Sequence, residues 1–121
     1  MYEEIETRIH DRKKLFEPIY QIVNGKEESI GFIFNLSISG VNLLIKEKQL
    51  NKLNENFSFI FHPPEELEID TIEFDVHQKW KSDLGKETFE EVGCSFNNQS
   101  KQQKDQLDIL IDYYKNQNTY Q

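Results

Sequence analysis

The sequence predicts a mainly β fold: a small six-stranded antiparallel β-barrel with a packed C-terminal helix. Three observations lead to this prediction. Apolar residues recur at every second position in about six short segments, and turn residues separate these segments. After residue 100 the apolar spacing changes to a helical period. A chain of 121 residues suits one domain with one modest core.

The first two expected strands cover residues 18–23 and 29–39, joined by an Asn24-Gly25 hairpin signal. In the second strand one parity is apolar: Ile30, Phe32, Phe34, Leu36 and Ile38. The other parity is mostly small or polar: Gly31, Ile33, Asn35, Ser37 and Ser39. Because successive strand residues point to opposite faces, we expect the first set to face the core. Gly40 then allows a turn or bulge, and alternation resumes from residue 41 to 45.

The second half of the chain repeats this pattern. A polar connection with a helical turn is expected before a strand at residues 57–61, and two prolines make 62–68 a loop. In the long strand 69–81 one parity carries Ile72, Phe74, Val76 and Trp80. Trp80 is therefore expected in the core, with contact to a ligand as the alternative. The last strand starts at Phe89 and should bury Val92, Cys94 and Phe96.

The C-terminal segment has the features of an amphipathic helix. Ser100 followed by Gln103 matches a capping box. Leu107, Leu110, Ile111 and Tyr114 follow at offsets 0, 3, 4 and 7, so they share one helix face. We therefore divide the chain into a flexible basic N-terminal arm, residues 1–17, and a barrel with its helix, residues 18–115.

Charge and cysteine content narrow the classes of function. The net charge of −8 disfavours binding to DNA, RNA or an anionic membrane. Cys94 is the only cysteine, which excludes an intrachain disulfide and suits a small core residue in a reducing cytosol. The N-terminus is acidic and polar rather than a signal peptide, and no apolar run is long enough for membrane insertion. We therefore expect a cytoplasmic protein.

Two short motifs carry the most specific chemistry. Of the 14 Lys and Arg residues only Arg8 and Arg12 are arginines, and the spacing of four places both on one face of a helix or strand. A guanidinium binds phosphate oxygens and the O6 and N7 atoms of guanine, and it stacks on flat rings. In the second motif, "NLSISG", Asn35 and Ser37 share a strand face, and Gly40 lets backbone approach a ligand.

Together, "RIHDR" and "NLSISG" resemble the PilZ domain family, over roughly residues 8 to 114. The resemblance implies a PilZ-type barrel that acts as a bacterial receptor for the second messenger cyclic di-GMP. It implies that Arg8 and Arg12 clamp phosphate and guanine, and that Asn35, Ser37 and Gly40 form the platform beneath the nucleotide. The motif often begins with Asp, so Asn35 offers the same acceptor without the charge.

We therefore predict a non-enzymatic nucleotide-binding adaptor that changes conformation on binding and signals through an unidentified effector protein. No cofactor is expected besides the ligand. The alternative is a PilZ-like protein-interaction module that binds no nucleotide, with Arg8 and Arg12 paired to acidic neighbours in solvent. His10 could be a second phosphate contact or simply exposed. His62 beside Glu65 and Glu66 matches no strong metal motif, and no catalytic motif is present.

Overall fold

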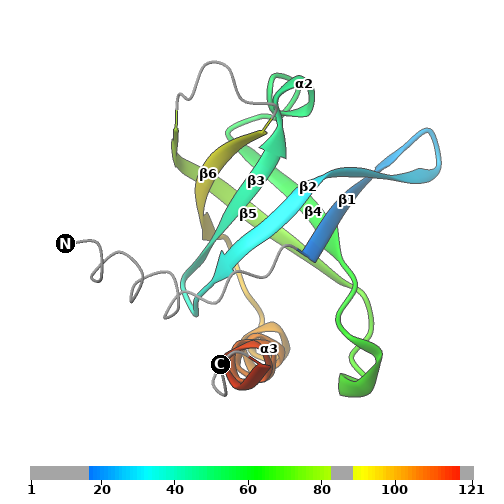
Figure 1. The fold of residues 1–121 in the computed structure, drawn as a ribbon, viewed down its shortest axis with the longest axis vertical. Helices are drawn as coiled ribbons and strands as arrows, with labels where there is room; N and C mark the ends of the chain where they lie inside the picture. Colours follow the sequence, from blue (N-terminus) through cyan, green and yellow to red (C-terminus); the bar gives the residue numbers. More distant parts are fainter. Residues whose placement is uncertain (1–16, 83–88, 118–121) are drawn as a thin grey trace.

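The computed structural model describes residues 17–82 and 89–117. The strands are β1 (Glu17–Val23), β2 (Lys26–Leu36), β3 (Gly40–Lys46), β4 (Asn56–Phe61), β5 (Ile72–Lys81) and β6 (Phe89–Phe96). The helical elements are α2 (Glu47–Leu50), the 3-10 turn η1 (Glu65–Leu67) and α3 (Lys101–Gln117). The strands pair in the order β1-β2-β3-β6-β5-β4 and close into an antiparallel barrel (Figure 1). The predicted fold class is therefore confirmed.

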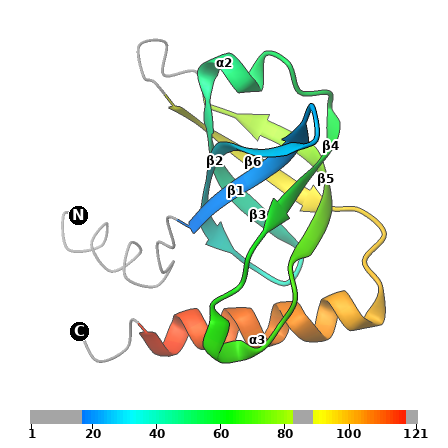
Figure 2. The same cartoon turned by 90° about the vertical axis from the view of Figure 1, so that its right-hand side faces the viewer.

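Helix α3 lies across one end of the barrel (Figure 2). Its apolar stripe is buried there, because Leu107 and Leu110 have no exposed surface and Tyr114 has only 7%. Two tyrosine hydroxyls connect the helix to the barrel side. Tyr114 donates to Glu17 of β1 at 3.1 Å, and Tyr113 donates to Glu66 of η1 at 2.8 Å. The helix therefore completes the core rather than standing apart from it.

The helix begins as the capping motif predicts. The backbone N–H of Gln103 donates to Ser100 Oγ at 3.1 Å, which satisfies one of the N–H groups that a helix start leaves open. The Gln103 side chain does not return to Ser100. Its amide donates instead to the carbonyl of Glu73 in β5, at 3.1 Å. This bond ties the first turn of α3 to the barrel wall.

Inward-facing side chains from all six strands fill the barrel. The largest fully buried strand residues are Phe59, Phe61, Phe74, Ile19, Ile30, Ile33, Leu43, Ile45, Val76 and Val92. Phe59 and Phe74 lie on paired positions of β4 and β5, with ring centroids 5.5 Å apart. Each such side chain contributes about 1.5–3 kcal/mol by leaving water. Core burial therefore fixes which face of each strand points outward.

The expected core face of the second strand is partly wrong, because β2 contains bulges. Ile30 is an extra residue of β2 relative to β1, and Phe34 is an extra residue of β2 relative to β3. An extra residue moves every later side chain to the opposite face. Ile33 follows the first of these bulges and is consequently fully buried, although the alternation assigned it to the outer face.

The other residues predicted for the core face of the second strand lie partly in the core and partly outside it. Ile30 is buried and Leu36 packs against the core, as expected. Phe32 is half-buried on the outer face, where its ring lies 5.7 Å from that of Phe89. Ile38 lies in the turn after β2 and is 52% exposed. The predicted core position of Trp80 is also wrong: β5 has a register shift between Gln78 and Trp80, and Trp80 is 49% exposed.

Candidate functional site

A row of four residues crosses the outer surface of the barrel. Asn35 of β2 pairs with Asn42 of β3, Asn42 pairs with Gly93 of β6, and Gly93 pairs with Trp80 of β5. Their strand neighbours Leu43 and Val92 are fully buried, so the row itself faces outward. Adjacent strands lie about 4.8 Å apart, so four positions span roughly 14 Å. We call these four residues the outer row.

One end of the outer row presents an aromatic face. A Cβ atom added to Gly93 would lie 2.3 Å from Cε2 and Nε1 of Trp80, so the indole rests directly on the glycine backbone. The other half of the ring system is open, because Trp80 is 49% exposed. A flat, half-exposed indole with a fixed position is suited to stacking on a planar ligand.

The middle of the outer row is polar. Asn42 donates from Nδ2 to Glu91 Oε2 at 3.3 Å, and Glu91 lies on the outer face of β6 two residues before Gly93. Asn35 is half-buried at the end of β2. Amide side chains present both donors and acceptors to a base edge, whereas the Glu91 carboxylate accepts only. This carboxylate disfavours a bound anion unless cations are brought near it.

The turn beyond Asn35 is built by Ser37 and Gly40. The Ser37 hydroxyl donates to the Gly40 carbonyl at 3.1 Å and accepts from the Gly40 N–H at 3.1 Å, and the Ser37 N–H donates to the same carbonyl at 2.9 Å. A Cβ atom on Gly40 would lie 2.4 Å from the carbonyl oxygen of Cys94. Gly40 is therefore required for the close approach of β3 to β6.

The structure thus gathers three of the predicted ligand-binding residues, Asn35, Ser37 and Gly40, at one end of the β2–β3 pair. Arg8 and Arg12, together with His10, lie outside the described residues. The sequence analysis missed Asn42 and Gly93. Asn42 stood out only as a polar residue on the outward parity of "GVNLLI". Gly93 had no sequence signal, because its importance depends on the ring that covers it.

Neither His62 nor Cys94 adds a metal-binding or nucleophilic group to the outer row. His62 bonds to Thr71 and to Glu27, each at 2.8 Å, rather than to Glu65 or Glu66. Burial raises the pKa of the Cys94 thiol to about 12, so this side chain stays protonated and is a poor nucleophile. Across residues 17–82 and 89–117, no group of three His, Cys, Asp or Glu side chains is placed to hold a metal ion. None of the helices there is long and apolar enough to cross a membrane.

A closed six-stranded barrel with a C-terminal helix and an outward-facing NxSxxG turn defines a small β-barrel domain. The family model of the PilZ domain matches residues 6–113. The chain belongs to the PilZ domain family. The match includes the segment that carries Arg8 and Arg12.

Two solved structures share the fold of this chain. The Bacillus subtilis inhibitor of motility (MotI/DgrA) aligns with a TM-score of 0.60 at 14% identity, over 85% of this chain and 48% of that protein. The chain thus spans about half the length of the Bacillus protein. The PilZ domain with c-di-GMP of YcgR from Escherichia coli aligns with a TM-score of 0.56 at 17% identity, over 84% of this chain and 83% of that domain. No curated protein was found to match the sequence.

Proposed function

We propose that this protein is a non-enzymatic receptor for cyclic di-GMP that acts through a protein partner. The observation that carries the proposal is the outer row, which places two amides and a half-exposed indole in register beside the NxSxxG turn. Membership of the PilZ family and the likeness to a PilZ domain solved with c-di-GMP support the choice of ligand.

The chemistry of the row suits the base portion of such a ligand. Trp80 provides a stacking surface for a guanine, and base–aromatic stacking contributes about 1–3 kcal/mol. Asn35 and Asn42 provide donors and acceptors for base edges. The row is long enough to contact more than one group of a dinucleotide. Trp80 is half-exposed, and Asn35 and Asn42 are half-buried on the outer face of the barrel.

The phosphates of the ligand require cations that the row itself lacks. Glu91 adds negative charge beside Asn42, and the chain as a whole carries −8. Exposed Lys79 and Lys81 flank Trp80 in β5, but neither lies in the outer row. In this proposal Arg8 and Arg12 supply the missing charge and bind phosphate and guanine from above. Residues 1–17 then change conformation on binding and alter the surface that a partner reads.

The experiment is isothermal titration of the full chain with cyclic di-GMP, compared with Arg12→Ala and Trp80→Ala. We expect saturable binding at micromolar or tighter affinity, abolished by Arg12→Ala and weakened about tenfold or more by Trp80→Ala. Lys104→Ala, on the exposed side of α3, removes the same kind of charge far from the row and should bind as the wild type does. Stoichiometry distinguishes one bound nucleotide from two.

The absence of heat with a folded sample, confirmed by a second binding method, would refute the receptor. The alternative of a protein-interaction module without nucleotide would then apply. Limited proteolysis tests the conformational step separately. Residues 1–17 should be cleaved at a different rate with saturating cyclic di-GMP, and equal rates would exclude the switch while leaving binding intact.

A further inference from the structure

The barrel has one weakly paired junction, between β1 and β4. Only Ile19–Phe61 and Tyr20–Ile60 join these strands, whereas β1 pairs with β2 along its whole length. Within residues 17–82 and 89–117, the part of β4 from Asn56 to Phe59 has no ladder partner on the β1 side. A strand edge without a partner is a template for pairing with another chain.

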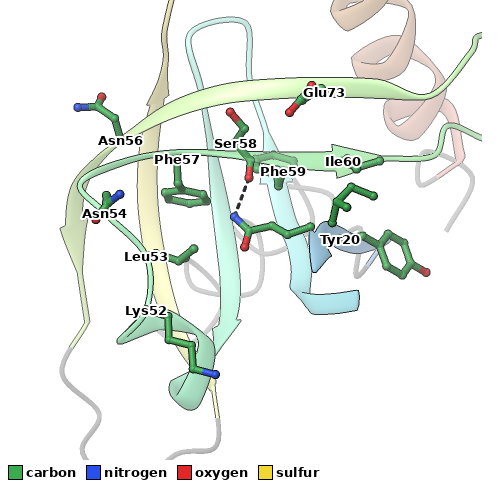
Figure 3. Close-up of a pocket in the computed structure, with 12 residues that line it drawn as sticks. Tyr20, Lys52, Leu53, Asn54, Asn56, Phe57, Ser58, Phe59, Ile60 and Glu73 are labelled. Carbon is green, nitrogen blue, oxygen red and sulfur yellow. Dashed lines mark hydrogen bonds between the residues drawn. The ribbon is translucent and has the colours of Figure 1, made fainter. Parts of the chain in front are cut away.

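An open groove follows from this divergence. It has a volume of about 400 Å³ and lies between the end of β1 and the start of β4 (Figure 3). The accessible surface of the groove is mostly polar, and it also includes apolar or aromatic side chains such as Tyr20, Ile22, Leu53 and Phe57. Ile22 is 57% exposed, which is unusual for isoleucine in a strand. The groove therefore combines an open strand edge with a few accessible apolar side chains.

The Gln21 side chain takes the place of the backbone N–H that a paired strand would offer to β4. Gln21 donates from Nε2 to the backbone carbonyl of Ser58 at 2.8 Å, across the groove (Figure 3). The carbonyl of Glu55 faces the other way, because it accepts from the N–H of Gln78 in β5. Backbone groups alternate along a strand, so those of Asn56 and Ser58 both point into the groove. An incoming strand can replace the Gln21 amide with a backbone N–H.

The charges around the groove favour a basic occupant. Glu73 lines it from β5, and Asp75 pairs with Ser58 on the same outer face. On the β1 side, Glu28 of β2 pairs with Gln21. Lys52 is the one cation among the lining residues. A strand that pairs with the open edge of β4 would place every second side chain against Phe57 and Leu53. Its remaining side chains would point toward these carboxylates.

We propose that β4 binds an extended segment of a partner protein, with alternating apolar and basic side chains, as an added strand at Asn56–Phe59. In this mode main-chain hydrogen bonds give affinity and alternate side chains give specificity. In the ring order of the barrel the β1–β4 junction lies opposite the β3–β6 junction, where the outer row crosses. This docking site is a second surface, distinct from the one that nucleotide binding alters in the proposed function, and both sites can be occupied together.

The test uses the full chain, labelled for NMR, and the capped heptapeptide acetyl-Lys-Val-Lys-Val-Lys-Val-Lys-amide. We expect saturable binding that slows hydrogen exchange at the amides of Asn56 and Ser58, both without and with cyclic di-GMP. The same peptide with N-methylated backbone amides keeps its side chains but cannot extend the ladder, so it should not bind. Equal binding of the methylated peptide, or no binding of either, overturns the proposal.

Variants of the protein test whether the peptide binds in the groove. Gln21→Ala removes the competing donor, so the peptide should bind about three- to tenfold more tightly. Glu73→Lys should weaken binding several-fold at low salt, whereas Asp108→Lys on the exposed face of α3 should not. Should Gln21→Ala fail to fold, the Glu73 and Asp108 pair still decides the question, because equal affinities would overturn the proposal.

Other occupants of the groove give distinct results. Protection of the Ser58 amide that appears only at high protein concentration, together with a dimer in sedimentation, would assign the groove to a second copy. Protection in the dilute free chain would assign it to a segment of the same chain. Either result overturns the proposal of a partner segment. None of these outcomes affects the nucleotide titration with Arg12→Ala, so the two proposals fail independently.

Discussion

The indole of Trp80 rests on the backbone of Gly93, its partner in the β5–β6 ladder. Any larger residue at position 93 would occupy the space of the ring. The contact explains how a residue that is 49% exposed is held on the outer face. A ring held in one orientation loses little freedom when a ligand stacks on it.

Gly93→Ala should therefore displace Trp80. We expect a loss of about 1–3 kcal/mol in the free energy of unfolding, because the added methyl overpacks the contact. Trp80 is the only tryptophan, so its fluorescence emission reports the displacement directly. Ser95→Ala, two residues further along the same outer face, is the control and should leave emission unchanged. Identical emission and urea midpoints for Gly93→Ala and wild type would contradict this account.

Because of the bulges in β2, we expect two isoleucines to contribute very differently to the free energy of unfolding. Ile33 is fully buried, so Ile33→Ala should lower the free energy of unfolding by about 2–5 kcal/mol. Ile38 is 52% exposed in the following turn, and Ile38→Ala should change it by less than about 0.5 kcal/mol. Urea denaturation measures both. A larger loss of unfolding free energy for Ile38→Ala than for Ile33→Ala would contradict these burial assignments and favour the uninterrupted alternation expected from the sequence.

Two glycines of positive φ differ in the space around them. A Cβ atom on Gly31 would lie 2.0 Å from the backbone carbonyl oxygen of Leu44, and a rigid strand cannot yield that space. Gly31→Ala should cost more than about 3 kcal/mol or prevent folding. Gly25 has open space around it but φ of +79°, so Gly25→Ala should cost only about 1–2 kcal/mol. If thermal unfolding shows Gly25→Ala to be less stable than Gly31→Ala, then β2 and β3 do not approach each other as closely at Gly31 as described.

Cys94 gives the chain a specific response to high pH. Burial raises the pKa of its thiol to about 12, whereas an unfolded cysteine titrates near 8.5. The folded state therefore favours the protonated thiol, and this stabilisation is present below pH ~8.5 and lost as pH rises toward ~12. Relative to Cys94→Val, the wild type should lose up to about 1.4 kcal/mol of unfolding free energy per pH unit in that range.

Thiol reactivity checks the same burial independently. At pH 8 Ellman's reagent should react slowly with the native protein and quickly in urea. Fast reaction in the native state, or parallel stability curves for wild type and Cys94→Val above pH 9, would show that the thiol is accessible to water.

The sequence contained enough information to predict the barrel and its helix. Alternation of apolar residues places Val41, Leu43 and Ile45 in the core, and the structure confirms all three. The helical spacing of Leu107, Leu110 and Tyr114 likewise predicts the buried face of α3. These predictions succeed because periodicity is a local property, set by the geometry of one strand or one helix.

The ligand-binding residues were predicted from motifs, and their roles remain predictions. Asn35, Ser37 and Gly40 adjoin one another because they are close in sequence and a turn joins them. Arg8 and Arg12 lie outside the described part of the chain, so their position relative to this turn is also a prediction. The family resemblance connects the two motifs, and no periodicity in the sequence does so.

Only the tertiary structure decided which faces Ile33, Phe32 and Trp80 occupy. Each lies beside a bulge, and a bulge arises from the fit between neighbouring strands rather than from the composition of either one. The same is true of the outer row and of the groove beside Ser58. Both depend on register between strands that are distant in sequence, and register is fixed when the barrel closes around its core.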